Sequence, residues 1–580
     1  MKLLKIALWL VGGLILLALA AVAIFALTFD PNRYKDEVER LVKERTGRTL
    51  QLKGPLEMAF WPSLGARVSG VVLSERAAER QFLSLDSAHA SVALMPLLQG
   101  DVIVDRVRVS GLNAHIVKDK EGRFNFQDLI ESKPGEKQAS NPAPEGSSGA
   151  VQFHIAGIQV ENAALVYRDL ASGEEIALSN LNLETGRIAE NAQGQVDFST
   201  ELKRSTPPLD AKLVLNGSYS LQPEAIGLDF TAKLDESTVK GKADIARAAQ
   251  MSYGFDVNID QINLDRYLAS SEKKQAATGK ATPPRKEDAD APVDLSGLKG
   301  LNAKGQLQIG ALQVQGLKLS NLKTGVRAAG GKAEIGPHSA ALYEGSLAGT
   351  LTLDANSNRV ALKETLSNIA VGPLLRDFAE QDRLEGRGNV SLDVAGAGRT
   401  VNALKSALQG SARVQLRDGA VKGVDIGALL RKARTALSSE PSQAADSKQR
   451  TDFSELSASF VIKNGVAHNE DLELKAPLFR IGGAGAIDIG KSTIDYVAKA
   501  SVVATAQGQG GRDLEQLAGI TVPVRLSGPL DDMKYQVDYR AVAGELAKSR
   551  VGGKVKESIE QQKDRIEDKV RDRLKGLLRR

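Results

Sequence analysis

The residue types that most often carry catalysis or bind metal ions are sparse in this sequence. The 580 residues include no cysteine and five histidines: His89, His115, His154, His338 and His468. The absence of cysteine excludes disulfides, zinc–thiolate sites, iron–sulfur clusters and thiol catalysis. No two histidines lie within helical reach of each other, so the spacing of an HExxH zinc site is missing. The sequence therefore predicts neither a metal centre nor a cofactor.

Other short motifs of catalysis and ion binding are also incomplete in this sequence. Gly331-Lys332 resembles the end of a phosphate-binding loop, but Val326 and Ala333 stand where that loop needs a glycine and a hydroxyl residue. Residues 119–122 lack the rest of a calcium loop and are typical of a hairpin turn. A hydrolase would need a group of residues that the sequence does not show. We therefore expect that the protein is not an enzyme.

An apolar segment near the N-terminus is the first structural element that the sequence predicts. No charged residue occurs between Ile6 and Phe29, and a helix of this length, about 36 Å, would span a bilayer. Lys2 and Lys5 precede it, which favours a cytoplasmic N-terminus and export of the remaining chain. A cleaved signal peptide ending near Ala18-Leu19-Ala20 is the alternative. The anchor positions are Ile6, Leu10, Leu14, Leu17, Val22 and Phe25.

A short amphipathic helix is predicted next. Asp30 is suited to cap it, Pro31 to occupy its first position, and Gly47 to end it. Its apolar residues Tyr34, Val38, Leu41 and Val42 recur at helical spacing, which predicts that they cap the region that follows.

Beyond Gly47 the hydrophobic period becomes two, which indicates strands with one apolar and one wet face. The fold predicted is mainly β: the transmembrane helix, then a long, twisted, groove-forming antiparallel sheet with a few short helices. The segments Leu178–Leu181 and Leu319–Leu322 share the sequence Leu-Ser-Asn-Leu, which indicates a repeated strand unit. The apolar faces could form either an open groove for acyl chains or a closed core. The candidate groove residues are Ile226, Leu228, Phe230, Val390, Leu392, Val394, Val414, Leu416, Tyr496 and Ala498.

Composition divides the chain into regions. Stretches rich in Pro, Ser, Ala and Lys predict linkers, and short helices are expected at 371–381, 401–408, 424–437 and 513–517. The predicted regions are the anchor 1–29, a helix-plus-strand region 30–131, a linker 132–149, a β region 150–269, a linker 270–292, a β region 293–437, a linker 438–451, a C-terminal β region 452–540 and a basic helix 541–580.

The net charge of +5 is concentrated at the C-terminal end. Residues 548–580 hold 12 Lys/Arg and 6 Asp/Glu, or +6, so the other residues sum to 5 − 6 = −1. A near-neutral body with 4% aromatic residues does not suit nucleic-acid binding. The basic tail is predicted to be an amphipathic helix that either lies free or self-associates, or docks on an anionic membrane or a partner. Its apolar positions are Val555, Ile559, Ile566, Val570, Leu574 and Leu577.

Taken together, several short motifs resemble the AsmA family, part of a wider AsmA-like group with TamB and YhdP. The resemblance extends from the anchor to about residue 539. The matching segments are 29–34, 47–48, 54–56, 60–65, 94–100, 107–112, 122–126, 265–268, 342–345 and 419–427.

The resemblance implies an inner-membrane protein of Gram-negative bacteria with its body in the periplasm. The wider group is similar to chorein-type bridge-like lipid-transfer proteins, which implies a β groove, outer-membrane assembly and lipid homeostasis. The implied partners are phospholipid, lipopolysaccharide, the two membranes and outer-membrane assembly proteins. The alternative hypothesis is a periplasmic scaffold that assists outer-membrane proteins without handling lipid.

Overall fold

The computed structural model of the chain forms two compact units, residues 1–281 (unit 1) and 282–580 (unit 2). None of the helices described is long and apolar enough to cross a membrane. The predicted anchor and the six apolar positions of the C-terminal helix lie outside the described residues, as do most residues of the predicted linkers. The described residues are 30–60, 63–98, 102–130, 153–205, 208–247, 250–268, 292–379, 382–423, 425–426, 443–444, 446–477, 479–503, 521–530, 532–538, 541 and 544.

The predicted N-terminal helix is confirmed, with the caps that the sequence indicated. A 3₁₀ turn η1 (Pro31–Tyr34) leads into helix α2 (Lys35–Thr46). The side chain of Asp30 accepts a hydrogen bond from the backbone N–H of Asn32, and Gly47 ends α2 in the left-handed conformation.

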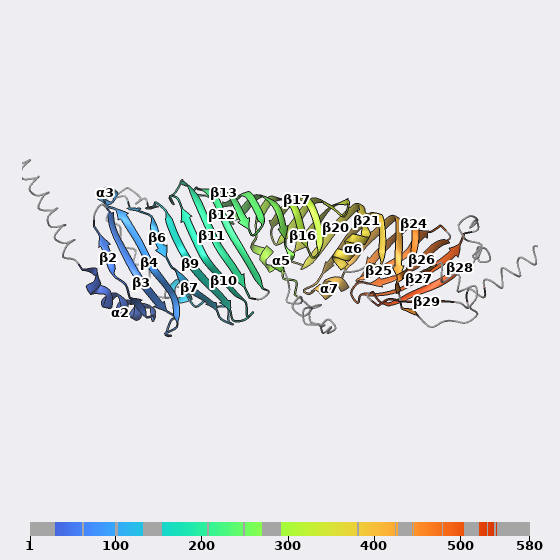
Figure 1. The fold of residues 1–580 in the computed structure, drawn as a ribbon, viewed down its shortest axis with the longest axis horizontal. Coiled ribbons are helices and arrows are strands. Elements are labelled where there is room, and N and C mark those ends of the chain that lie inside the picture. The colour runs from blue at the N-terminus through green and yellow to red at the C-terminus, as the bar shows by residue number, and fades with distance from the viewer. Residues whose placement is uncertain are drawn as a thin grey trace, which may run out of the picture. The chain divides into compact units, whose positions relative to one another are not determined.

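The described strands of unit 1 form one sheet (Figure 1). At its first edge, β1 and β2 both pair with β3, and β3 pairs with β4. The next position is shared by β5, β6 and β7, which all pair with β4; then come β8 and β9, and finally β10 to β15 in chain order. The prediction of an antiparallel sheet is corrected at this one place, because β5, β6 and β7 pair with β8 and β9 in parallel. This pairing also joins the predicted regions 30–131 and 150–269 in one sheet. The strands are β1 (Leu50–Leu52), β2 (Leu56–Ala59), β3 (Ser63–Ser74), β4 (Gln81–Ala93), β5 (Val102–Val104), β6 (Val107–Ser110), β7 (Asn113–Lys118), β8 (Phe153–Ile155), β9 (Ile158–Asp169), β10 (Glu175–Thr185), β11 (Gln193–Arg204), β12 (Leu209–Leu221), β13 (Ala225–Leu234), β14 (Ser237–Ala246) and β15 (Ser252–Asn263).

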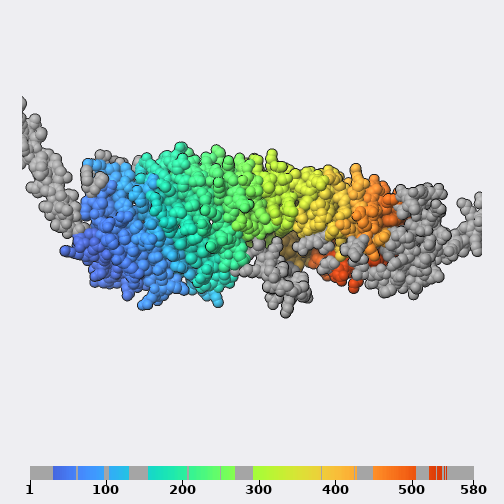
Figure 2. Space-filling model, viewed as in Figure 1, coloured from blue at the N-terminus to red at the C-terminus, as the bar shows by residue number. Residues whose placement is uncertain are grey.

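Three short helices accompany this sheet: α3 (Leu94–Leu98), α4 (Gln127–Ile130) and α5 (Asp265–Leu268). Figure 2 shows one face of unit 1, and on this face the side chains of neighbouring segments are in contact and leave no visible gap.

Unit 2 begins with a 3₁₀ turn η5 (Ser296–Gly300) and continues as an antiparallel meander from β16 to β22. Two of the four expected short helices, those at 371–381 and 401–408, are confirmed as α6 (Val371–Ala379) and α7 (Val401–Ser406). The predicted helix at 513–517 and nearly all of the one at 424–437 lie outside the described residues. The strands are β16 (Ala303–Val314), β17 (Leu317–Ala329), β18 (Lys332–Leu342), β19 (Gly345–Asp354), β20 (Arg359–Ala370), β21 (Leu384–Ala397), β22 (Gln409–Gly423), β23 (Gln443–Ala444), β24 (Asp446–Lys463), β25 (Val466–Lys475), β26 (Phe479–Asp488), β27 (Thr493–Val502), β28 (Thr521–Pro529) and β29 (Lys534–Val537).

The C-terminal part of unit 2 closes on itself. β24 pairs with β22 and starts a meander that ends at β29, and β29 then pairs with β23, which lies just before β24 in the chain. The predicted linker 438–451 is therefore wrong in its second half, since β24 begins at Asp446 and pairs there with Gly423.

The repeated Leu-Ser-Asn-Leu sequence forms a β-bulge. Asn180 and Asn321 both have a left-handed backbone (φ 51° and 53°), and the register shifts beside each. Asn368, in the related sequence Leu366-Ser367-Asn368-Ile369, does the same (φ 55°). Two apolar residues three positions apart would face opposite sides of a regular strand. The extra residue of the bulge returns both of them to the apolar face.

Candidate functional site: the apolar sheet faces

The strand register of unit 1 gathers its apolar side chains on one face. On β13, Ile226 pairs with Leu221 of β12 and Ile245 of β14. Leu228 pairs in the same way with Tyr219 and Ala243. The alternation that the sequence predicted for β13 is confirmed, and neighbouring strands continue it.

Glycines leave room for the largest side chain of this row. Phe230 pairs with Gly217 on one side and Gly241 on the other. A Cβ added to Gly217 would lie 2.6 Å from the carbonyl oxygen of Asp229 and 3.2 Å from the Cβ of Phe230. The glycines therefore accommodate the close approach of strand β13 and its ring.

The apolar face of unit 1 is only half-buried. Ile226, Leu228 and Phe230 are all of intermediate exposure. In the described part of unit 1, Phe82 is the one large apolar side chain that is fully buried, and the other buried apolar residues are alanines. No cluster of buried apolar side chains forms among these residues, since all three such clusters belong to unit 2. Of the two arrangements that the sequence left open, the geometry of unit 1 fits the open face.

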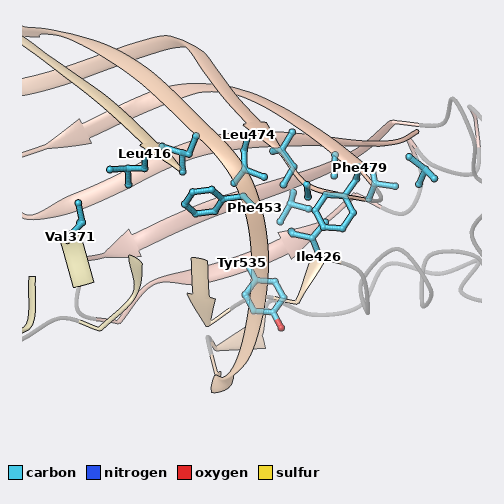
Figure 3. Close-up of a cluster of buried hydrophobic side chains, with 14 of the residues drawn as sticks. Val371, Leu416, Ile426, Phe453, Leu474, Phe479 and Tyr535 are labelled. Atoms are coloured by element: carbon cyan, nitrogen blue, oxygen red, sulfur yellow. The ribbon is translucent and has the colours of Figure 1, made fainter. Parts of the chain in front are cut away.

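Unit 2 differs, because its rolled end encloses a hydrophobic core. Phe453, Leu474 and Phe479 lie close together in the space between its curved strands (Figure 3). Leu416, with 1% of its surface exposed, belongs to this core. Val522 and Val524 on β28 are equally buried in it.

The seven groove candidates of unit 2 all lie on its apolar face, and three of them are buried. Leu416, Tyr496 and Val394 are buried, so at these three positions the closed core is the arrangement found. Tyr496 also donates a hydrogen bond from its hydroxyl to the Asn469 side chain. The other four, which are half-buried and pack against the buried clusters, are Val390, Leu392, Val414 and Ala498.

One polar pair interrupts the apolar face of unit 2. His338 and Glu364 both pair with Gly349, and both side chains are 11% exposed. The His338 Nε2 lies 2.8 Å from Glu364 Oε1, and its Nδ1 lies 3.3 Å from the carbonyl oxygen of Ile335. Each polar group thus has a partner, as burial requires. The sequence gave no sign of this pair, because its members lie on different strands.

Hydrogen-bonded side chains fasten the N-terminal end of unit 1. Arg48 is fully buried, and its guanidinium donates to both carboxylate oxygens of Asp128 (3.0 Å to Oδ2) and to the carbonyl oxygens of Ser74 and Asn125. It also stacks 4.8 Å above the ring of Phe82. These hydrogen bonds from Arg48 lower the pKa of Asp128. Two of the family-like segments, 47–48 and 122–126, therefore meet in space.

A tyrosine–aspartate pair holds a short helix in each unit. In unit 1, the hydroxyl of Tyr267 on α5 donates to Asp235 (2.7 Å), and burial with this bond raises the pKa of Tyr267 to about 12. In unit 2, the hydroxyl of Tyr343 donates to Asp377 on α6 (2.9 Å), and its pKa is likewise raised to about 12. Both shifts come first from burial, which disfavours the charged phenolate. These tyrosines are therefore neutral donors that position helices.

The histidines do not converge. Within the described ranges, no three His, Asp or Glu residues form a group that could hold a metal ion. A depression of about 640 Å³ lies on the polar face of unit 2, where Arg417, Glu455 and Lys475 are among its lining residues. Lys475 and Glu455 form an ion pair across it (2.7 Å). Such a charged lining does not suit an acyl chain, so the apolar face of unit 1 is the better candidate site.

The fold and this site define a class of β-sheet protein in which successive strands turn their apolar side chains to one face, which is half-buried in unit 1 and partly closed into a core in unit 2. The sequence model of the AsmA family matches residues 1–218 and 228–472. The chain belongs to the AsmA family, which confirms the resemblance found in its motifs. It is 22% identical over 581 residues to Protein AsmA of Escherichia coli (strain K12), covering 90% of this chain and 92% of that protein. No solved structure matches it.

Proposed function

We propose that this protein is a non-enzymatic envelope protein that carries phospholipid acyl chains on the apolar face of unit 1. In this proposal residues 1–29 anchor it in the inner membrane, the body lies in the periplasm, and its activity supports outer-membrane assembly and lipid homeostasis. Phospholipid is the proposed cargo, with lipopolysaccharide as a second lipid partner and outer-membrane assembly proteins as protein partners.

The half-buried apolar face of unit 1 is the observation that carries this proposal. Exposed apolar surface costs about 25 cal/mol per Å² in water, and contiguous apolar patches commonly mark binding sites. Leu228 and Phe230 belong to a row that continues through neighbouring strands and leaves no buried cluster beneath it. Acyl chains need an apolar surface without directional polar partners, and a row of this kind supplies one.

A charge placed on this face tests the proposal. Leu228→Asp should strongly reduce the cross-linking of a photoactivatable phospholipid to the full-length protein in proteoliposomes, because an acyl chain would have to desolvate the new carboxylate. Thr231→Asp is the matched control, since it puts the same charge on the exposed face of the same strand. Circular dichroism of both variants checks that they remain folded.

The scaffold hypothesis predicts the opposite result. If neither the unmodified protein nor the Thr231→Asp control cross-links phospholipid, while both cross-link outer-membrane proteins, the lipid proposal fails. Equal lipid labelling of the two variants would show that lipid binds away from this face.

A further inference from the structure

Helix α2 and Tyr34, the residue before it, present an exposed apolar stripe. Tyr34, Val38 and Leu41 follow one another at helical spacing, and they are 54%, 41% and 45% exposed. The sequence had suggested that Tyr34, Val38, Leu41 and Val42 cap the sheet; Val42 is half-buried, whereas the other three are exposed. No residue of α2 is buried.

A different and largely polar side of the helix contacts the sheet. The ammonium group of Lys35 donates to the carbonyl oxygen of Gly54 (2.6 Å), and the carboxylate of Glu39 accepts from the backbone N–H of Leu52 (2.7 Å). Asn32, in η1, both accepts from and donates to the backbone of Leu56. These bonds fix the rotation of α2 about its axis and so keep the apolar stripe turned away from the sheet contact.

The position of this stripe in the chain indicates what it contacts. The uncharged stretch from Ile6 to Phe29 ends one residue before the cap Asp30. If that stretch crosses a bilayer, α2 starts at the membrane surface. Exposed large apolar residues are also concentrated near this end of the chain. Of the fourteen among the described residues, six fall before residue 96: Tyr34, Val38, Leu41, Met58, Leu64 and Met95.

We propose that α2 lies in the interface of the membrane to which the chain is anchored, with Tyr34, Val38 and Leu41 inserted among the lipid headgroups and upper acyl chains. An interfacial helix buries such a stripe while its polar side faces water. Because η1 and α2 are hydrogen-bonded to β1 and β2, this contact would hold the first strands of unit 1 at the bilayer surface. The inference rests on the anchor in the proposed function and does not depend on lipid transport.

The absence of cysteine makes a direct test possible, since single cysteines can be labelled without background. Full-length protein with Val38→Cys or Leu41→Cys would carry an environment-sensitive fluorophore in vesicles of three parts phosphatidylethanolamine to one part phosphatidylglycerol. Lys43→Cys is the matched control, because Lys43 is exposed on the same helix outside the apolar stripe.

We expect quenchers attached to lipid acyl chains to reduce the emission of the Val38 and Leu41 labels at least two-fold more than that of the Lys43 label. Iodide dissolved in the water should quench the Lys43 label more strongly than the Val38 and Leu41 labels. Equal quenching at all three positions overturns the proposal, as does cross-linking between Val38→Cys copies in dilute vesicles, which would show that a second copy covers the stripe. Protein that does not sediment with vesicles would refute the anchor as well. If the Val38 label is inserted but the photoactivatable phospholipid does not cross-link to the unmodified protein, this inference stands while the transport proposal fails.

Discussion

The contrast between an open face in unit 1 and a closed core in unit 2 can be measured with two leucines. Leu416 is 1% exposed within the core of unit 2, whereas Leu228 is half-buried on the face of unit 1. Leu416→Ala removes a fully buried side chain and leaves a cavity, which costs about 3–4 kcal/mol. Leu228→Ala removes a side chain that is in part already hydrated, and no enclosed cavity forms, so the cost is about 1 kcal/mol.

Hydrogen–deuterium exchange of the full-length protein measures the loss of stability caused by each substitution in the strands around it. A local measurement is needed because a chain of two units need not unfold in one step. Each 1.4 kcal/mol changes the opening equilibrium, and with it the exchange rate, about tenfold. Leu416→Ala should therefore speed exchange in peptides of β22 and β24 by about 150- to 700-fold. Leu228→Ala should speed exchange in β12 to β14 by about five-fold. Leu416→Met, which nearly conserves volume, is the control, with an expected cost below about 1.5 kcal/mol. Similar acceleration by the two alanine variants would refute the distinction between face and core.

Three further results are expected. Arg48→Met should destabilise unit 1 by about 3–5 kcal/mol, because it leaves the Asp128 carboxylate without its buried partner, whereas Arg40→Met on exposed α2 should leave the midpoint of thermal unfolding nearly unchanged. The lowered pKa of Asp128 means that its stabilisation is complete above the ordinary value of 3.8 and is lost as pH falls through the lower folded value. Exchange in residues 121–130 should therefore rise below pH 3.8, and Asp128→Asn should remove that part of the pH dependence. Asn321→Ala should cost about 1 kcal/mol in chemical unfolding through its left-handed backbone, and Asn321→Gly should be better tolerated; equal losses would mean that the side chain matters more than φ.

Local patterns in the sequence were enough to predict the strands and their faces. Alternation with a period of two depends on neighbouring residues, so it predicted the inward set Ile226, Leu228 and Phe230 on β13, which the register confirms. The caps Asp30 and Gly47 were predicted for the same reason, since each acts within one helical turn. The repeated Leu-Ser-Asn-Leu sequence predicts a repeated strand unit, and the asparagine between apolar residues three positions apart is also a signal for a bulge.

Features that depend on distant residues could not be predicted in this way. The ion pair of Arg48 with Asp128 and the pair of His338 with Glu364 join separate segments, and single-sequence patterns say nothing about which segments meet. The parallel pairing of β7 with β9 likewise depends on how the chain returns after residue 118. A single alternation pattern is also equally compatible with a sheet that stays open and one that folds over.

The sequence by itself therefore determined that the protein consists of strands with one apolar side, begins with an uncharged segment long enough to cross a membrane, and carries the motifs of its family. Each of these is a property of residue type and short spacing. Only the tertiary structure decided where the apolar side is covered. In unit 2, Leu416 packs into a buried cluster with Phe453 and Leu474, and Tyr496 is buried as well. In unit 1, Leu228 is half-buried and belongs to none of the buried clusters formed by the described residues. Burial is a result of long-range pairing, so residues with the same local pattern became core in one unit and a candidate lipid surface in the other.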